Sequence, residues 1–230
     1  MAQVWLVTGS SRGLGHAIVE AGLAAGNKVL ATARDIKSLA DLSERYGDQV
    51  KLFAMDVTDE AAAANAVMAA VDVFGSLDVV INNAGYGNLS SVEDTPLSEF
   101  RAQIETNLFG TIIVTKAALR YFREKKAGQF IQFSSVGGRI GPPGRGPYSA
   151  AKWGVEGFSE CFRAKWRRSA SRSPSLNPVA FAQTSRAVPP NFAKVILHTI
   201  RRLELPQDFS GTTTASNLVT PKRQLGRSSS

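Results

Sequence analysis

Short apolar runs rich in β-branched residues alternate with longer segments of helical period over the first two thirds of the chain. Such runs are typical of strands that are buried on both faces of a parallel sheet, and the periodic segments are typical of helices that cover it. The pattern therefore predicts a single α/β domain with a doubly wound parallel sheet of the Rossmann type. The expected strands are residues 3–9, 28–34, 50–56, 77–85 and 128–135, and the expected helices are residues 13–25, 36–46, 59–74, 98–125 and 147–166.

This alternation stops after Trp166. Residues 166–230 are rich in Ser, Arg and Pro, and their one longer apolar patch, residues 192–205, favours an amphipathic helix over a strand. We therefore divide the chain into an α/β domain, residues 1–165, and an aberrant basic tail, residues 166–230. The C-terminal strands of the fold are expected to be missing. Residues 129–133 would then form an uncovered sheet edge, and the chain would be disordered or loosely packed from about residue 168.

The net charge of +8 raises the question of a nucleic-acid partner. Residues 1–162 hold 15 Lys and Arg against 17 Asp and Glu, whereas residues 163–230 hold 12 against 2, so the basic excess lies entirely in the tail. The tail offers only four aromatic side chains for base stacking. A nucleic-acid-binding tail is therefore the weakest of the functions considered, and no nucleic-acid partner is expected.

Composition also bears on where the protein works. The sequence has no run of 18 apolar residues and no charged segment followed by a cleavage site at its start. Its single cysteine, Cys161, excludes an internal disulfide and fits a reducing compartment. We expect a soluble cytoplasmic protein with no membrane partner.

The first predicted strand runs into the glycine-rich turn "TGSSRGLG", residues 8–15, which opens a helix. Gly9 permits a tight turn, Gly13 lets a pyrophosphate approach the backbone, and Gly15 lets the helix pack closely on the strand. With a strand before it and a helix after it, this turn predicts a dinucleotide site. The candidate cofactor-binding residues in the turn are Gly9, Ser11, Arg12, Gly13, Leu14 and Gly15.

The end of the second predicted strand indicates which dinucleotide binds. A carboxylate there would accept hydrogen bonds from an adenosine ribose, whereas a cation would hold a 2'-phosphate. Arg34 lies near this strand end, and Arg12 lies in the glycine-rich turn. The two arginines favour NADP over NAD, although a register shift of one residue would place Asp35 there instead.

A second group of polar residues suggests acid and base chemistry. Tyr148 and Lys152, in "YSAAK", are four residues apart on a predicted helix and so share a face. An ammonium next to a tyrosine lowers the pKa of the phenol toward the range where it can exchange protons. Ser135, at the end of the fifth predicted strand, can offer a hydroxyl to the same substrate oxygen, and Asn107 is a polar amide inside a predicted helix.

Together these motifs resemble the short-chain dehydrogenase/reductase family over about residues 3–162. The resemblance implies that Tyr148 is the catalytic acid and base, that Lys152 lowers its pKa and holds the nicotinamide ribose, and that Ser135 orients the substrate oxygen. It also implies that Asn107 anchors a water in a proton relay. Asp56 resembles the family's adenine contact, and Asn83, in "NNAG", resembles its sheet-centre and cofactor contact.

The resemblance stops within a few residues of Arg163. A change of reading frame at this point would explain such an abrupt end. When the third base of each codon is joined to the first two bases of the next, residues 165–187 can encode "VAPLGIAVTLVEPGGFRTDFAG". In the same frame residues 216–224 can encode "QPGDPKAA", and both resemble the family's continuation. We therefore expect the tail to be a frameshift product from one lost or two gained bases near codons 161–165. A genuine divergent basic tail is the alternative.

The function expected from this resemblance is NADP-dependent oxidoreduction, in which a carbonyl and a secondary alcohol are interconverted by hydride transfer. A small-molecule carbonyl or alcohol is the expected substrate, no metal is expected, and the family resemblance implies a homo-oligomer. If the C-terminal part of the fold is absent, the alternative is a cofactor-binding protein without turnover.

Overall fold

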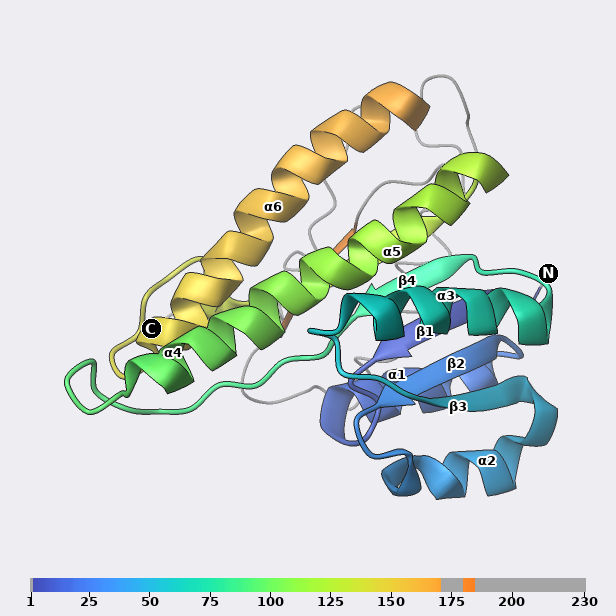
Figure 1. The fold of residues 1–230 in the computed structure, drawn as a ribbon, viewed down its shortest axis with the longest axis horizontal. Coiled ribbons are helices and arrows are strands. Elements are labelled where there is room, and N and C mark those ends of the chain that lie inside the picture. Colours follow the sequence, from blue (N-terminus) through green and yellow to red (C-terminus); the bar gives the residue numbers. More distant parts are fainter. Residues whose placement is uncertain (1, 171–179, 185–230) are drawn as a thin grey trace, which may run out of the picture.

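The protein is built around one parallel β-sheet, as the apolar runs predicted. A computed structural model describes residues 2–170 and 180–184. Within these residues the sheet has six strands in the order β3-β2-β1-β4-β5-β6, and each neighbouring pair is parallel (Figure 1). The chain therefore has the predicted doubly wound α/β architecture. The strands are β1 (Val4–Thr8), β2 (Lys28–Ala33), β3 (Val50–Ala54), β4 (Val79–Asn82), β5 (Gln129–Ser135) and β6 (Ala180–Thr184).

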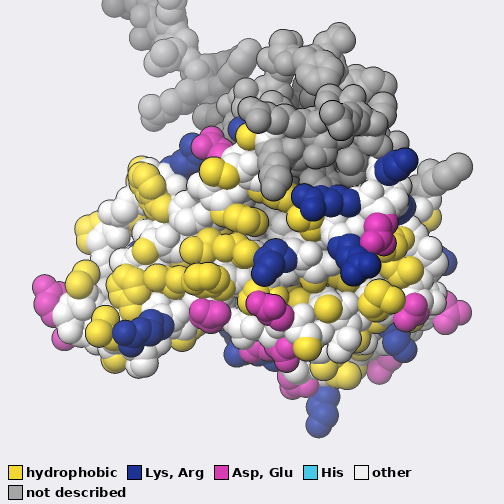
Figure 2. Space-filling model, turned by 45° about the horizontal axis from the view of Figure 1, so that its top comes forward, with side chains coloured by type: hydrophobic (Ala, Val, Ile, Leu, Met, Phe, Trp, Pro, Cys, Tyr) yellow, Lys and Arg dark blue, Asp and Glu magenta, His cyan; other side chains and the backbone are white. Residues whose placement is uncertain are grey.

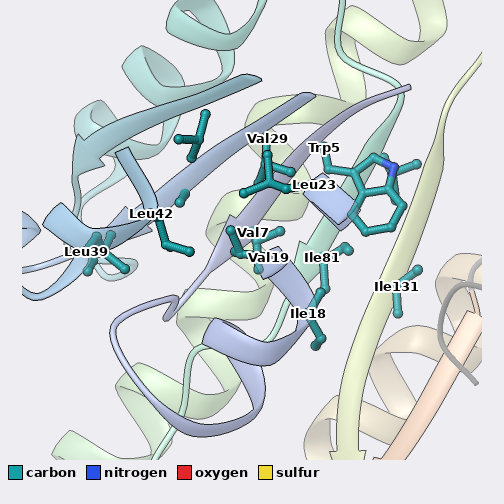
Figure 3. Packing of buried hydrophobic residues seen from close by; sticks show 14 of the residues in the cluster. Trp5, Val7, Ile18, Val19, Leu23, Val29, Leu39, Leu42, Ile81 and Ile131 are labelled. Carbon is teal, nitrogen blue, oxygen red and sulfur yellow. The ribbon is translucent and has the colours of Figure 1, made fainter. Parts of the chain in front are cut away.

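Helices cover both faces of the sheet and give it two apolar cores. On one face, Ile18, Val19 and Leu23 of α1 pack with Leu42 of α2 against the strands around the buried Trp5 (Figure 3). On the other face, side chains of α3 and α5 pack on the opposite side of the same strands, and Phe162 of α6 joins them. These helices are α1 (Gly13–Ala24), α2 (Ala40–Tyr46), α3 (Glu60–Phe74), α5 (Gly110–Lys125) and α6 (Gly146–Ala170).

The helix expected over residues 98–125 contains an irregular turn. It begins as α4 (Leu97–Ile104), continues as the π-helical segment η3 (Glu105–Phe109) and becomes α5 without leaving helical backbone angles. Such π-helical turns are rare and occur frequently at functional sites. The buried side chain of this turn is Asn107, which the sequence had singled out.

The segment after β2 is tighter than the single helix expected over residues 36–46. It starts as a 3-10 turn, η1 (Ile36–Leu39), and only then continues as α2. Asp35 begins η1, because its carboxylate accepts a 2.9 Å hydrogen bond from the backbone N–H of Lys37. A side-chain cap of this kind favours a turn directly after the strand.

The expectation that the sheet ends at its fifth strand is wrong. Strand β6 pairs with β5 from Ile131↔Ala180 to Ser135↔Thr184, so the edge of residues 129–133 is covered for most of its length. The run "VAFA", residues 179–182, holds only one β-branched residue and was therefore not among the expected strands. Parallel pairing needs only backbone N–H and C=O groups, so such a short run suffices. The disorder expected from about residue 168 is also not found where the tail is described, because α6 runs to Ala170 and residues 180–184 form β6. The remaining expectations for the tail, including a helix over residues 192–205, lie outside the described residues.

Candidate functional site

The predicted site residues lie along one edge of the sheet. Because the strands are parallel, their carboxyl ends meet there, and the strand order changes direction between β1 and β4. Open α/β sheets bind their ligands in the crevice at such a point. The glycine-rich turn follows β1, Arg34 follows β2, Asp56 lies after β3, Asn83 follows β4, and Ser135 is the last residue of β5.

The glycine-rich turn has the shape that its sequence predicted. Gly9 has a φ of +68°, and a Cβ placed on it would lie 2.8 Å from the Cα of Ala84. A Cβ on Gly15 would overlap the carbonyl oxygen of Gly9 and the amide nitrogen of Asn83. Any larger residue at either position would push the turn away from the end of β4. Leu14 packs against the apolar core beneath α1 and so anchors the turn to that core.

The first turn of α1 is open to an anion. Arg12 is the N-cap residue, with extended backbone angles, and no described side chain caps the helix. Gly13 has a φ of +58°, and a Cβ on it would meet nothing within 4 Å. Uncapped N–H groups at a helix N-terminus attract phosphate through hydrogen bonds and the helix dipole. The turn, which also contains the half-buried Ser11, therefore fits a pyrophosphate.

Asn83 ties the glycine-rich turn to β4. Its side-chain amide donates to the carbonyl oxygens of Thr8 and Gly9, at 2.9 and 3.2 Å. The hydroxyl of Thr8 in turn accepts the backbone N–H groups of Asn83 and Ala84, at 3.0 and 2.9 Å. Thr8 is thus a site residue that the sequence analysis quoted without assigning it a role, although it opens the "TGSSRGLG" motif.

The two residues after β2 have different surroundings. Arg34 follows Ala33 directly and is exposed, whereas the carboxylate of Asp35 is turned to the N–H of Lys37. Asp56, after β3, accepts the backbone N–H and the hydroxyl of Thr58 at 2.9 and 2.8 Å. These hydrogen bonds, helped by the nearby Arg34, hold the pKa of Asp56 below its usual value. The strand end therefore presents a cation rather than a free carboxylate.

Tyr148, Lys152 and Ser135 converge across α6 and the end of β5. The ammonium of Lys152 lies 5.8 Å from the centre of the Tyr148 ring. The Ser135 hydroxyl accepts the N–H of Gly137 at 3.2 Å, and a Cβ on Gly137 would lie 3.3 Å from the same ring. The structure therefore brings the three predicted side chains to one place.

Lys152 is buried, with 5% of its surface exposed, and donates a 2.8 Å hydrogen bond to the carbonyl oxygen of Phe133 on β5. Burial lowers its pKa from 10.5 to about 8, and the nearby carboxylate of Glu156 raises it only in part. Lys152 can therefore exchange a proton near neutral pH.

Asn107 is buried, and its side-chain amide both accepts and donates hydrogen bonds. It accepts the backbone N–H of Tyr86 at 3.1 Å and donates to the carbonyl oxygens of Tyr86 and Gln103, both at 2.8 Å. A Cβ on Gly85 would overlap its amide oxygen and lie 3.6 Å from Nζ of Lys152. Asn107 thus fixes the loop after β4 beside Lys152, a tie across 21 residues that sequence spacing could not reveal.

One further charged residue lies against Tyr148. The guanidinium of Arg145 is 5.7 Å from the centre of the tyrosine ring, close enough for a cation–π contact. Sequence reasoning missed Arg145, and its only signal was its place three residues before Tyr148. Among the residues that the structure describes, no three His, Cys, Asp or Glu side chains gather as a metal site would need. No helix in this part of the chain is long and apolar enough to cross a membrane.

Several known proteins are similar to this chain in sequence or in fold. The chain is 38% identical to the oxidoreductase BOA17 of Botryotinia fuckeliana over 90% of its own length and 87% of the relative. It is 40% identical to an uncharacterized oxidoreductase of Schizosaccharomyces pombe over 67% of its own length, but spans only 52% of that relative. A metagenomic short-chain oxidoreductase, solved in complex with NADP, matches with a TM-score of 0.76 and 27% identity over 86% of this chain and 89% of the other.

A doubly wound sheet with a glycine-rich turn at its switch point is the framework of a dinucleotide-dependent oxidoreductase. The chain belongs to the short chain dehydrogenase family, whose model matches residues 3–187. This match extends past residue 162, where the sequence analysis placed the end of the resemblance, and it includes β6.

Proposed function

We propose that the protein is an NADP-dependent oxidoreductase that interconverts a small-molecule carbonyl compound and its secondary alcohol, with Tyr148 as acid and base. The observation that carries the proposal is the convergence of the Ser135 hydroxyl, the Tyr148 ring and the buried Lys152 beside the dinucleotide crevice. A bound nicotinamide cofactor would supply or accept the hydride.

Each side chain has a separate task in this proposal. The hydroxyl of Ser135 donates a hydrogen bond to the substrate oxygen and orients it. Tyr148 gives a proton to that oxygen during reduction and takes one from the alcohol in the reverse direction. The positive charge of Lys152 stabilises the phenolate left after proton donation. Asn107 keeps the loop after β4 in contact with Lys152, and as a proposal from family resemblance it also anchors a relay water.

Arg12 and Arg34 support NADP as the cofactor. Both guanidiniums are exposed, and the described ion pairs within 4 Å include neither of them, although Arg34 is near enough to Asp56 to lower its pKa. Asp35, the residue that would have favoured NAD, is used to begin η1. The pyrophosphate would lie at the first turn of α1, with Asp56 and Asn83 at the crevice wall.

The alternative of cofactor binding without turnover rested on the absence of the C-terminal part of the fold, which comprises the sixth strand and the lid. The presence of β6 removes the first of these two grounds, whereas the lid falls outside the described residues. A cytoplasmic location and a homo-oligomer remain part of the proposal. The oligomer is supported by exposed aromatic side chains on the helices of the site, Phe109 on η3 and Trp153 on α6, which are 45% and 55% exposed. Figure 2 shows hydrophobic side chains gathered on one face of the molecule.

The test is turnover of ketones and aldehydes by the purified chain, followed through the absorbance of reduced nicotinamide. Tyr148→Phe keeps the ring and removes the hydroxyl, so it should lower kcat by about 10² to 10⁴ while the affinity for NADPH stays nearly unchanged. Tyr121→Phe, on α5, is the matched control and should leave kcat at the parental value. Parental turnover by Tyr148→Phe would show that another group is the acid.

A further inference from the structure

The face of α6 that carries the candidate site continues to a third ionisable residue. Tyr148, Lys152 and Glu156 follow one another at intervals of four, so they lie on the same side of the helix. Glu156 is 7% exposed, and its carboxylate forms a 2.9 Å ion pair with the guanidinium of Arg139. A carboxylate buried to this degree needs a partner, since its charge is poorly stabilised away from water.

Arg139 belongs to the segment that carries Ser135. After Ser135 the chain makes the 3-10 turn η4 (Val136–Gly138), and the N–H of Arg139 closes it by donating to the carbonyl oxygen of Val136 at 2.9 Å. The ion pair thus joins the end of the Ser135 turn to the helix of Tyr148 and Lys152.

The turn contacts the helix through glycines, which have no side chains. Other contacts must therefore fix the distance between the turn and the helix. A Cβ on Gly138 would lie 2.9 Å from the carbonyl oxygen of Lys152, and a Cβ on Gly137 would contact the Tyr148 ring. Neither glycine can hold the turn in place by side-chain packing. The side chain of Arg139 is 52% exposed, and it extends from the turn to the helix, where it pairs with the buried carboxylate of Glu156.

We propose that the Arg139–Glu156 ion pair is a positioning device, which holds the turn after Ser135 against the helix that carries Tyr148 and Lys152. The two residues do not contact the reacting atoms. They set the separation between the Ser135 hydroxyl and the Tyr148 hydroxyl, which must reach one substrate oxygen together. Catalytic geometry of this kind is sensitive, because a displacement of about 1 Å can reduce a rate about 10²-fold.

This inference rests on the proposed function, and its test uses one measurement that needs turnover and one that does not. The variants are Arg139→Met, Glu156→Gln and the double variant, with Arg139→Lys to restore the charge. Arg120→Met is the matched control, because it breaks the Arg120–Glu124 ion pair on the exposed side of α5. If Arg139→Met does not fold, Glu156→Asp, which keeps the charge and shortens its reach, takes its place.

Each single substitution at the pair should lower kcat about 10- to 100-fold at saturating NADPH, while the dissociation constant of NADPH changes less than about twofold. The double variant should be no slower than the slower single variant, because both remove the same contact. Arg139→Lys should recover most of the rate, and Arg120→Met should behave like the parent. Parental kcat in both single variants, or losses that multiply in the double variant, would overturn the proposal.

Hydrogen exchange tests the same contact without turnover. Backbone amides of residues 136–141 should exchange faster in Arg139→Met and Glu156→Gln than in the parent and in Arg120→Met, with no change in α1. If the parent turns over no carbonyl, the proposed function fails, and the exchange result still decides the role of the pair. Unchanged exchange in this segment, or a uniform increase over the whole chain, would refute a local positioning role.

Discussion

Replacing Lys152 with methionine should make the protein without cofactor more stable at neutral pH, although it should abolish turnover. Lys152 is buried beside the carbonyl oxygen of Phe133, and burial lowers its pKa from 10.5 to about 8. The folded protein therefore binds the lysine proton more weakly than the unfolded chain does. The charged side chain destabilises the fold wherever both states are protonated, which is below about pH 8.

The size of this effect follows from the two pKa values. Their difference, between 10.5 and about 8, corresponds to about 3 kcal/mol of unfolding free energy at neutral pH. Methionine also loses the hydrogen bond to Phe133, which offsets about 1 kcal/mol of the gain. The expected net stabilisation is about 2 kcal/mol, or a rise in Tm of about 4 to 8 °C for a chain of this length.

The pH dependence gives the sharper check. Between about pH 8 and 10.5 the folded lysine is neutral while the unfolded lysine stays protonated, so the parent gains stability as the pH rises. Urea unfolding followed by circular dichroism should therefore show the advantage of Lys152→Met at about pH 7 and its loss by about pH 10. Lys116→Met, at an exposed position on α5, is the control and should show neither effect. A Lys152→Met variant less stable than the parent at neutral pH would refute the reasoning.

Two further predictions concern binding. Replacing both Arg12 and Arg34 with alanine should weaken the binding of NADPH about 10- to 100-fold and leave the binding of NADH nearly unchanged, because only NADPH carries the 2'-phosphate. Titration followed by cofactor fluorescence measures both affinities. Equal affinities for the two cofactors in the parent would contradict the assignment. Trp153→Glu should shift the sedimentation of the protein to that of a monomer, whereas Met68→Glu, equally exposed on α3, should not; a parent that sediments as a monomer would rule out the oligomer.

Five strands of the sheet were predictable because they are short apolar runs, and β1, β2, β4 and β5 are buried almost throughout, so local sequence alone identifies them. The residues of the glycine-rich turn were predictable for the same reason, since their spacing is tied to one strand and one helix. Contacts between distant segments left no such signal. The amide of Asn107 bonds the backbone of Tyr86, and Arg139 pairs with Glu156, but neither partner can be inferred from spacing along a single element.

The segment after α6 shows a different reason for failure. Strand β6 pairs through its backbone, so its side chains need not resemble those of a family strand. By side-chain type this segment does not look like a buried strand, so β6 was not predicted. Because backbone pairing depends little on side-chain type, the presence of β6 neither supports nor contradicts a frameshift. The frameshift stays a prediction about the gene, and the nucleotide sequence of codons 155–190 tests it directly.

The candidate site concentrates ionisable groups where the fold can support them least. Lys152 and Glu156 are both buried on one side of α6, and each has a partner on β5 or on the turn that follows it. A fold selected for stability alone would place apolar side chains at such positions, since well-packed apolar residues replace buried charges at little or no loss. The two charges therefore need a functional explanation, and the proposed roles supply one: Lys152 acts on the proton of Tyr148, and Glu156, through Arg139, acts on its position. On this argument Lys152→Met gains stability and loses chemistry, whereas Arg139→Lys keeps both.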